Sequence, residues 1–444
     1  MNKKIHVIIT IITLLILNST SVTSIQKESI EKLQTPNNQI TDIGSYIIVP
    51  DDFLTIQQAI DNSETDATIY VRTGTYSENL IIDKALTLIG QEKEITIIDG
   101  TQTDSVVKVL ADNVMINNFT IQNSSSEIPK QGGIESYSSN SYYHNNILLN
   151  NQVGIHILDG DNNIIIYNHI SGCSTESICI HTSYNTVYQN NIEDNSYGIW
   201  LQPDASKNEI KQNNFINNEV YHAAVKKATS NKWDQNYWDN WIGLKIPTLK
   251  FLPKIIPKFQ SLISWFNLDW HPLTDPIEIK PLPLTIIKTA MGDMTLQLFS
   301  DKMPITTNNY IRLSNVEFFN GLVFHRVIDD FMIQGGGRYA NGTIKKSQFG
   351  TIPLETHPEV LHVDGAISMA RTSDPDSATS QFFICDEAQH RLDGDYAAFG
   401  VIINGIDVLR SIASVETTTK YFLKDWPTDD IFIEDTDIIA PSFL

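Results

Sequence analysis

The sequence predicts a mainly β protein that is built from two successive domains. Its 444 residues are too many for one ordinary domain and enough for two, and 41% of them are hydrophobic, which is enough for packed cores. A repeat of about 22 to 23 residues in the first half predicts a parallel β-helix. In the second half, apolar and polar residues are interleaved from Phe324 to Val327, and three glycines follow a few residues later, which predicts a strand that ends sharply.

The first 24 residues have the pattern of a secretory signal peptide. Lys3 and Lys4 precede an apolar run from Ile5 to Leu17, and the small-residue pattern Val22-Thr23-Ser24 follows. The run is shorter than the roughly 20 residues that span a bilayer. We therefore expect a secreted or cell-surface protein without a transmembrane span after signal removal, with an uncleaved anchor as the alternative. Residues 25–44 are polar, which predicts a flexible lead.

Residues 45–241 are expected to form the β-helix, with a short amphipathic helix near its start, at 53–60. After about residue 105, each repeat contains three short strands, and Asn precedes most of them. Apolar positions in these strands should point inward and stack on the next turn. Asparagine at the corners should tolerate left-handed backbone geometry and hydrogen-bond to its neighbour in the next turn. One set of these strands occupies residues 118–121, 146–148, 169–170, 191–192 and 214–216.

This first domain resembles the right-handed β-helix repeats of pectin-lyase-like and periplasmic copper-accessory proteins. Its ending, Trp233 to Trp241, is similar to that of surface proteins of methanogenic archaea. The resemblance implies a fold and leaves open whether the domain is a spacer, a targeting or glycan-binding module, or a polysaccharide-cleaving enzyme. The acidic candidates for cleavage lie at expected corners, where Asp is also a common turn former. They are Asp159, Asp161, Asp194 and Asp204.

The cysteine count is odd, so no full disulfide framework is expected. Cys173 and Cys179 either pair or are stacked as core residues by the repeat turn that holds them. His156 and His181 lie in strand-like segments that could meet on neighbouring turns, so metal binding there stays an alternative. The main expectation is that the protein uses no metal and no cofactor.

Residues 242–283 are rich in proline and lysine, with apolar residues between them. Because a solenoid needs its open end covered, we expect a cap and linker here. The alternative is a basic amphipathic surface that touches lipid, but the prolines argue against a long interfacial helix. The formal net charge of the chain is −21, which makes nucleic acid an unlikely partner.

Residues 284–440 contain the candidate site, in three stretches: Val323 to Gly337, Gly365 to Phe383 and Leu392 to Gly400. Arg326 is a cation that cannot be deprotonated in a protein. It stands near apolar residues and an amide, with no nucleophile or set of metal ligands beside it. This pattern predicts a site that binds and polarises a peptide backbone and does not cleave it.

These three stretches resemble the cyclophilin family of peptidyl-prolyl isomerases in their order and spacing. The likeness is closer to prokaryotic members, which often have Arg where Arg371 stands. The resemblance implies a closed eight-stranded β-barrel with two capping helices, so the full expected fold is a right-handed parallel β-helix followed by a cyclophilin-like barrel. It also implies peptidyl-prolyl cis-trans isomerase activity.

The resemblance assigns roles to individual residues. Arg326, Gln334 and Phe331 would be catalytic: Arg326 donates to the prolyl nitrogen, withdraws its lone pair from amide resonance and so lowers a barrier of about 20 kcal/mol. Gln334 would hold Arg326 and the substrate carbonyl. The expected proline pocket comprises Phe331, Met332, Phe383 and Leu392, and the expected contacts to the substrate chain are Ala370, Arg371, Gln381 and Tyr396, which stands where many members have His.

Two neighbours of these residues carry further expectations. His325 should pack behind the site, because adjacent strand residues face opposite ways. Arg391 stands where animal cyclophilins often have an aromatic residue, which puts strong cyclosporin binding in doubt.

The expected function is isomerisation of Xaa-Pro segments in unfolded or surface proteins that have been exported, with the β-helix binding cell-envelope glycan, targeting the enzyme or acting as a spacer. One alternative is a non-catalytic module that binds proline peptides. The other is a carbohydrate-active β-helix enzyme with a passenger cyclophilin.

Overall fold

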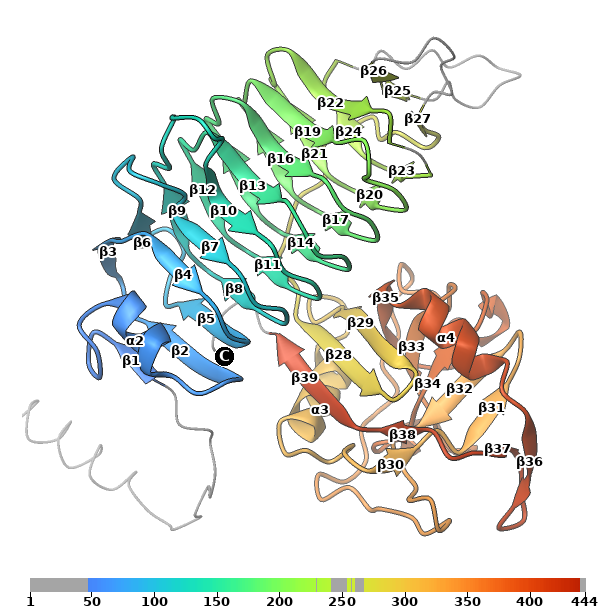
Figure 1. Ribbon diagram of the computed structural model, residues 1–444. Coiled ribbons are helices and arrows are strands. Elements are labelled where there is room, and N and C mark those ends of the chain that lie inside the picture. The colour runs from blue at the N-terminus through green and yellow to red at the C-terminus, as the bar shows by residue number, and fades with distance from the viewer. Residues whose placement is uncertain (1–46, 229, 241–253, 257, 260–266, 440–444) are drawn as a thin grey trace, which may run out of the picture. The chain divides into compact units, whose positions relative to one another are not determined.

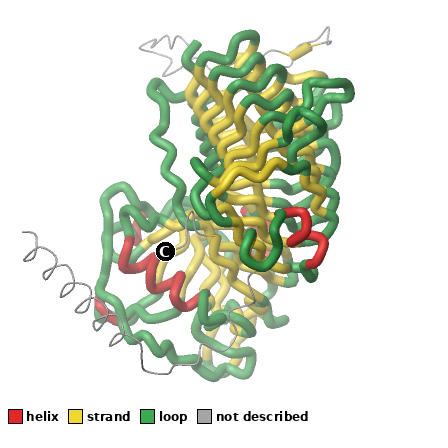
Figure 2. The backbone as a smooth tube through the Cα atoms, turned by 90° about the vertical axis from the view of Figure 1, so that its left-hand side faces the viewer, coloured by secondary structure: helices red, strands yellow, loops and turns green. Residues whose placement is uncertain are grey.

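The computed structural model describes residues 47–228, 230–240, 254–256, 258–259 and 267–439. The expected signal peptide, the flexible lead and residues 242–253, 257 and 260–266 of the expected cap lie outside this set. Among the regular elements of the described residues, strands are far more numerous than helices (Figure 2). The α-helices there are α2 (Ile56–Asn62), α3 (Pro304–Ser314) and α4 (Ile406–Ala413). In the described part of the chain, none of them has the length and apolar character needed to cross a membrane.

The first domain is a parallel β-helix with three sheets, as the repeat predicted (Figure 1). The first sheet contains β1 (Ile47–Val49), β2 (Ala67–Val71), β5 (Leu86–Gly90), β8 (Met115–Asn117), β11 (Tyr142–His144), β14 (Ile164–Ile166), β17 (Thr186–Tyr188), β20 (Glu209–Lys211), β23 (Lys232–Asp234), β27 (Asn267–Asp269) and β25 (Lys254–Ile256). The second contains β4 (Leu80–Ile82), β7 (Val107–Val109), β10 (Gly132–Ser136), β13 (Val153–Ile157), β16 (Glu176–Ile180), β19 (Tyr197–Leu201), β22 (Tyr221–Lys226) and β26 (Lys258–Phe259). The third contains β3 (Gly74–Ser77), β6 (Thr96–Asp99), β9 (Thr120–Gln122), β12 (Ile147–Leu149), β15 (His169–Ser171), β18 (Asn191–Glu193), β21 (Asn214–Ile216) and β24 (Tyr237–Trp238).

Apolar residues of successive turns stack in rows inside this helix. In the third sheet, Ile170, Ile192 and Phe215 are register partners on successive strands, and all three are fully buried. Trp238 continues the row, with its ring stacked on Phe215 at a centroid distance of 4.2 Å. Because each turn buries its apolar face only against its neighbours, no turn is stable alone.

Asparagine side chains form hydrogen-bonded ladders along some corners, and at others asparagines such as Asn145, Asn150 and Asn162 adopt a positive φ, so both roles expected of asparagine are confirmed. The Oδ1 atoms of Asn190, Asn213 and Asn236 each accept the backbone N–H of the asparagine one turn earlier, at 2.9 to 3.0 Å. The left-handed residue of these corners, however, is the one before the asparagine, such as Gln189 or Gln212. At these corners the asparagine contributes through its side chain, while its neighbour supplies the positive φ.

Strands β25, β26 and β27 extend two of the sheets beyond the last full repeat. Asp269 in β27 ends the asparagine ladder, because its Oδ2 accepts the backbone N–H of Asn236 at 3.0 Å and its side-chain N–H at 2.9 Å. The Nε1–H of Trp238 donates to the same oxygen at 3.1 Å.

The cysteines are not bonded to one another: Cys173, Cys179 and Cys385 are all free and buried. Among the described residues, the four acidic candidates for polysaccharide cleavage do not form a group of three or more carboxylates close enough to hold a metal ion. Two of them stabilise turns, since Asp159 accepts the N–H of Gly160 and Asp161 accepts the N–H of Ser183, both at 2.8 Å.

The C-terminal domain contains one curled antiparallel sheet of eight strands. In sheet order they are β31 (Arg326–Ile328), β32 (Met332–Gly335), β34 (Phe382–Cys385), β33 (Ala366–Met369), β35 (Ala398–Asn404), β29 (Gly292–Leu298), β28 (Leu284–Thr289) and β39 (Asp435–Ile439). Four further strands pair outside it: β30 (Leu322–Val323) with β38 (Phe432–Ile433), and β36 (Thr417–Lys420) with β37 (Leu423–Pro427).

The eight strands and the two helices, α3 and α4, match the expected barrel with one difference in its closure. Among the described residues, the sheet ends at β31 and β39, which do not pair with each other. The interior is packed with apolar and aromatic residues, among them Phe324, Phe382 and Phe399, which are fully buried. This core leaves the opposite face of β31, β32 and β34 for the site.

A groove on the sheet of the C-terminal domain

One row of side chains crosses the sheet at the candidate site. Arg326 in β31 pairs with Gln334 in β32, and Gln334 pairs with Phe383 in β34. Because directly paired residues project to the same face of a sheet, the expected cation, amide and aromatic ring lie side by side. Met332, two residues before Gln334, projects to this same face.

An apolar slot lies next to this row. Met332 and Phe383 are buried there and pack with Ala366 and Cys385, and four half-buried residues of the predicted site pack against them. The slot therefore unites six of the ten predicted residues: Phe331, Met332, Ala370, Phe383, Leu392 and Tyr396. Residues separated by up to 65 positions in the sequence meet here, as a pocket for a proline ring requires.

The polar residues of the row line a cavity of about 300 Å³ beside the slot, formed by Arg326, Gln334 and Gln381 together with the β36–β37 hairpin. Gln334 donates through Nε2 to Oε1 of Gln381 at 3.0 Å, which fixes both amides. A Cβ atom at Gly337 would overlap the side chain of Gln381, which explains one of the three glycines after β32.

The guanidinium of Arg326 remains available to a ligand. Its side chain is 42% exposed, and its only ionic neighbour in the described residues is Asp425, at 3.8 Å from Nε. An exposed ion pair of this kind contributes little, about 0 to 1 kcal/mol. Arg326 lines the cavity, and its Cζ atom lies 6.0 Å from the centre of the Phe331 ring, which packs against the slot, so the cation is close to both.

Two other arginines cover aromatic walls of the slot. The Cζ atom of Arg371 lies 4.4 Å from the ring centre of Tyr396, and Arg391 lies 4.5 Å from that of Phe331. Arg371 also donates twice to the carbonyl of Asp395, at 2.8 and 3.0 Å, which fixes its position. Cation–π contacts of exposed residues contribute about 0.5–1 kcal/mol. Both arginines therefore help to keep the aromatic side chains at the edge of the slot in place.

One expected contact to the substrate chain, the backbone of Ala370, is narrowed by the structure to a single group. The N–H of Ala370 donates to the carbonyl of Gln381 at 2.8 Å, so it is already used inside the domain. The carbonyl of Ala370 is then the group of that residue that a substrate chain can pair with.

Sequence reasoning missed two groups that support the site. His362 is fully buried, stacks on Phe383 at a centroid distance of 6.0 Å and hydrogen-bonds to Asp393 at 2.9 Å. Asp425, with Phe422, belongs to the β36–β37 hairpin, whose first residue lies about 90 positions after Arg326. No local motif marks either group, because only the fold brings them to the row.

His325 is buried, as expected, and its ring lies 6.0 Å from that of Trp426. His325 also borders the cavity that Arg326 lines. Burial lowers the pKa of His325 to about 4, and the positive charges of Arg338 and Arg326 act in the same direction.

This shift predicts that acid destabilises the domain. An unfolded histidine has a pKa of about 6.5, so as the pH falls from about 6.5 to about 4 the unfolded state binds a proton before the folded state does. The free energy of unfolding of this domain should therefore fall by about 3 kcal/mol over that range. Hydrogen exchange of the β31 and β32 amides at pH 7 and at pH 4.5 measures the loss.

His325→Gln should remove this loss of unfolding free energy at acidic pH. His390→Gln, at an exposed histidine of the same domain, should leave the loss in place. An equal acid sensitivity of wild type and His325→Gln would contradict the assignment.

Comparison with known proteins gives the same picture for both domains. Residues 284–438 match the model of the family described as "Cyclophilin type peptidyl-prolyl cis-trans isomerase/CLD", and residues 91–237 match "Right handed beta helix region". The chain is 39% identical over 152 residues to a peptidyl-prolyl cis-trans isomerase of Acinetobacter baylyi, a match that covers 33% of this chain and 80% of the relative.

Two other bacterial relatives match the same domain. Peptidyl-prolyl cis-trans isomerase A of Dickeya dadantii is 36% identical over 35% of this chain and 83% of its own length. Peptidyl-prolyl cis-trans isomerase B of Escherichia coli is 36% identical over 33% of this chain and 93% of its own length. With a right-handed β-helix preceding its isomerase domain, the chain belongs to the cyclophilin-type peptidyl-prolyl cis-trans isomerase family.

Proposed function

We propose that the groove isomerises Xaa-Pro bonds through Arg326, on the unfolded or surface segments of exported proteins. The observation that carries this proposal is the half-exposed guanidinium, which lines the polar cavity and lies near Phe331 of the apolar slot. With the proline ring in the slot, the prolyl nitrogen faces the guanidinium, and a donated hydrogen bond withdraws the nitrogen lone pair from the amide.

No covalent intermediate is needed for this reaction. The planar amide has its lone pair in resonance and accepts poorly at nitrogen, whereas the twisted amide accepts well. Arg326 therefore binds the twisted state more strongly than either planar isomer, and such differential binding is what lowers a barrier. Gln334, held by Gln381, is placed to position the substrate carbonyl.

Export is supported by the sequence. The cationic start, the apolar run of Ile5 to Leu17 and the small residues after it are the pattern of a secretory signal. We propose that the enzyme acts at the cell surface or outside the cell. Fractionation of cells that express the full chain, with the N-terminal residue of the mature protein read by mass spectrometry, tests this; an uncleaved protein in the cytoplasm would contradict it.

For the β-helix we propose a targeting, spacer or glycan-binding role. Aromatic side chains on neighbouring strands support the last of these: Tyr197 stacks on Tyr221 at 6.3 Å and meets Trp200 edge to face at 5.5 Å. All three are half-buried. Tyr and Trp with one wet face are common in binding surfaces, because they give large contact areas at low entropic cost.

The decisive experiment measures cis–trans exchange of a short Xaa-Pro peptide by NMR with the full chain present. We expect line broadening and faster exchange at catalytic protein concentrations. Binding of the peptide without faster exchange would mean that the groove only holds proline segments.

The glycan role is tested separately. Binding of envelope polysaccharide to the full chain should weaken in Trp200→Ala and stay unchanged in Tyr184→Ala, an exposed aromatic on another part of the same domain. Release of new reducing ends from the polysaccharide would instead indicate a carbohydrate-cleaving enzyme.

A further inference from the structure

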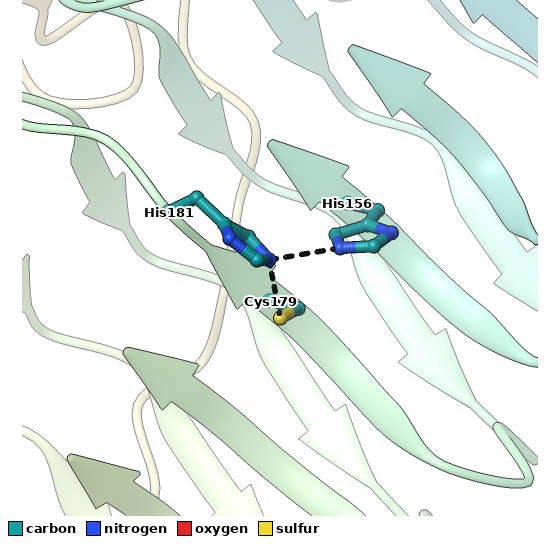
Figure 3. Close-up of side chains that lie close together, drawn as sticks. All are labelled: His156, Cys179 and His181. Atoms are coloured by element: carbon teal, nitrogen blue, oxygen red, sulfur yellow. Dashed lines mark hydrogen bonds between the residues drawn. The ribbon is translucent and has the colours of Figure 1, made fainter. Parts of the chain in front are cut away.

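A cluster of three metal-binding side chains lies on the β-helix, outside the isomerase domain. His156 in β13 and Cys179 in β16 are direct register partners on neighbouring strands. Each alternates with buried isoleucines, so both project away from the core of the helix. His181 follows Cys179 by two residues, and its ring turns back toward the other two side chains (Figure 3).

The distances between the potential ligand atoms fit one coordinated ion. Nε2 of His156 lies 3.2 Å from Nε2 of His181, which lies 3.7 Å from Sγ of Cys179. Zinc binds nitrogen at about 2.0–2.1 Å and sulfur at about 2.3 Å, and at tetrahedral angles these bonds separate two nitrogens by about 3.3 Å and nitrogen from sulfur by about 3.6 Å. All three atoms lie within 4.8 Å of one another.

The cluster is sheltered, and one side of it stays accessible. His156 is 6% and Cys179 is 1% exposed, whereas His181 is half-buried. Gln202 donates through Nε2 toward Sγ of Cys179 at 3.7 Å, a contact that orients the sulfur. Such contacts outside the ligand set are typical of metal sites, because they fix the ligand atoms before the ion arrives.

The charges around the cluster are mixed. Glu135 is the register partner of His156 on the other side and is buried, and Glu176 begins the strand that carries Cys179. Lys130 forms an ion pair with Glu176 at 2.7 Å. Lys130 therefore neutralises the carboxylate of Glu176, and the carboxylate of Glu135 remains as a negative charge that favours a bound cation.

A simpler arrangement explains only part of the geometry. Two neutral imidazoles can share one hydrogen bond between their Nε2 atoms, which accounts for the 3.2 Å distance. It does not account for the third soft ligand at the same point, because a thiol is a weak hydrogen-bonding group. Two imidazoles and a sulfur that converge on one point are the donor set that zinc accepts.

We propose that His156, Cys179 and His181 bind one Zn²⁺ ion through the two Nε2 atoms and Sγ, with a fourth position open to water. On binding, the thiol of Cys179 releases its proton to solvent and the thiolate becomes the ligand. The site is independent of the isomerase groove, so the failure of either proposal leaves the other standing.

The test measures metal binding by the full chain after treatment with a chelator and a reductant. Titration with Zn²⁺ should show one equivalent bound tightly. Titration with Co²⁺ should produce a sulfur-to-metal charge-transfer band together with the intense ligand-field bands of a tetrahedral ion. Less than one equivalent in the wild type, or a Co²⁺ spectrum without the sulfur band, would overturn the proposal.

Variants locate the site. Cys179→Ser should abolish the sulfur band, and it should weaken Zn²⁺ binding by at least about 100-fold, since loss of an outer contact alone costs about 10- to 100-fold. His181→Ala, at the half-buried ligand, should weaken binding similarly with little risk to folding. His169→Asn, at a strand histidine that pairs with Glu193, is the matched control and should bind as the wild type does. Equal binding by all four proteins would overturn the proposal.

Discussion

Replacing Arg326 with alanine should lower kcat/KM for Xaa-Pro isomerisation by about 10²- to 10³-fold, the usual effect of removing one donor that stabilises a transition state. The loss should fall mainly on kcat, because the guanidinium contributes most when the amide is twisted. Exchange of a Xaa-Pro peptide, followed by NMR over a range of peptide concentrations, separates the two constants.

Two further variants make the result specific. Arg326→Lys keeps the charge and loses the planar donor fork, so we expect an activity between those of the wild type and the alanine variant. Arg312→Ala removes an exposed arginine that stacks on Phe349 at 4.1 Å, away from the groove, and should leave the rate unchanged. Activity of Arg326→Ala within about threefold of the wild type would refute the assigned role.

Replacing Asn190 with alanine should destabilise the β-helix by about 2–6 kcal/mol. Its Oδ1 accepts the backbone N–H of Asn168 at 2.9 Å, and its Nδ2 donates to the carbonyl of Ile165 at 2.9 Å and to Asn213 at 3.0 Å. All of these groups are buried, and each buried group that loses its partner costs about 1–3 kcal/mol. Hydrogen exchange of the amides in β14 and β17 reports the loss locally.

Asn191→Ala is the matched control, one residue further along the chain. Asn191 is half-buried, and its side chain accepts one hydrogen bond, from Asn214 at 2.7 Å. The expected cost is below about 1.5 kcal/mol, the net value of a single hydrogen bond. Similar losses for the two variants would show that the ladder contributes no more than an ordinary surface contact.

The β-helix could be predicted from the sequence because its repeat is local and regular. Apolar residues recur at a fixed interval, and an asparagine marks the corners, so strand number and stacking follow from counting. The division of labour at the corners could not be predicted. Asparagine suits both a left-handed backbone and a side-chain ladder, and the sequence alone does not show that Gln189 and Gln212 take the first role.

The groove could be predicted only as far as its motifs extend. Arg326, Gln334 and Phe383 lie in short characteristic stretches, and the sheet then places them in one row. Asp425 and His362 reach the row through the fold alone, so nothing near them in the sequence indicates their positions.

Asp269 gives the β-helix a chemically distinct end. Each asparagine of the ladder both accepts and donates, and so it prepares the next rung. Asp269 accepts hydrogen bonds from Asn236, Trp238 and His271 and, among the described residues, donates none through its side chain. A rung without a side-chain N–H can offer a further turn only its backbone N–H. The antiparallel strand β25 pairs with β27 at the edge where another parallel turn would otherwise add, so the exposed edge of this sheet no longer has the repeat's parallel pattern.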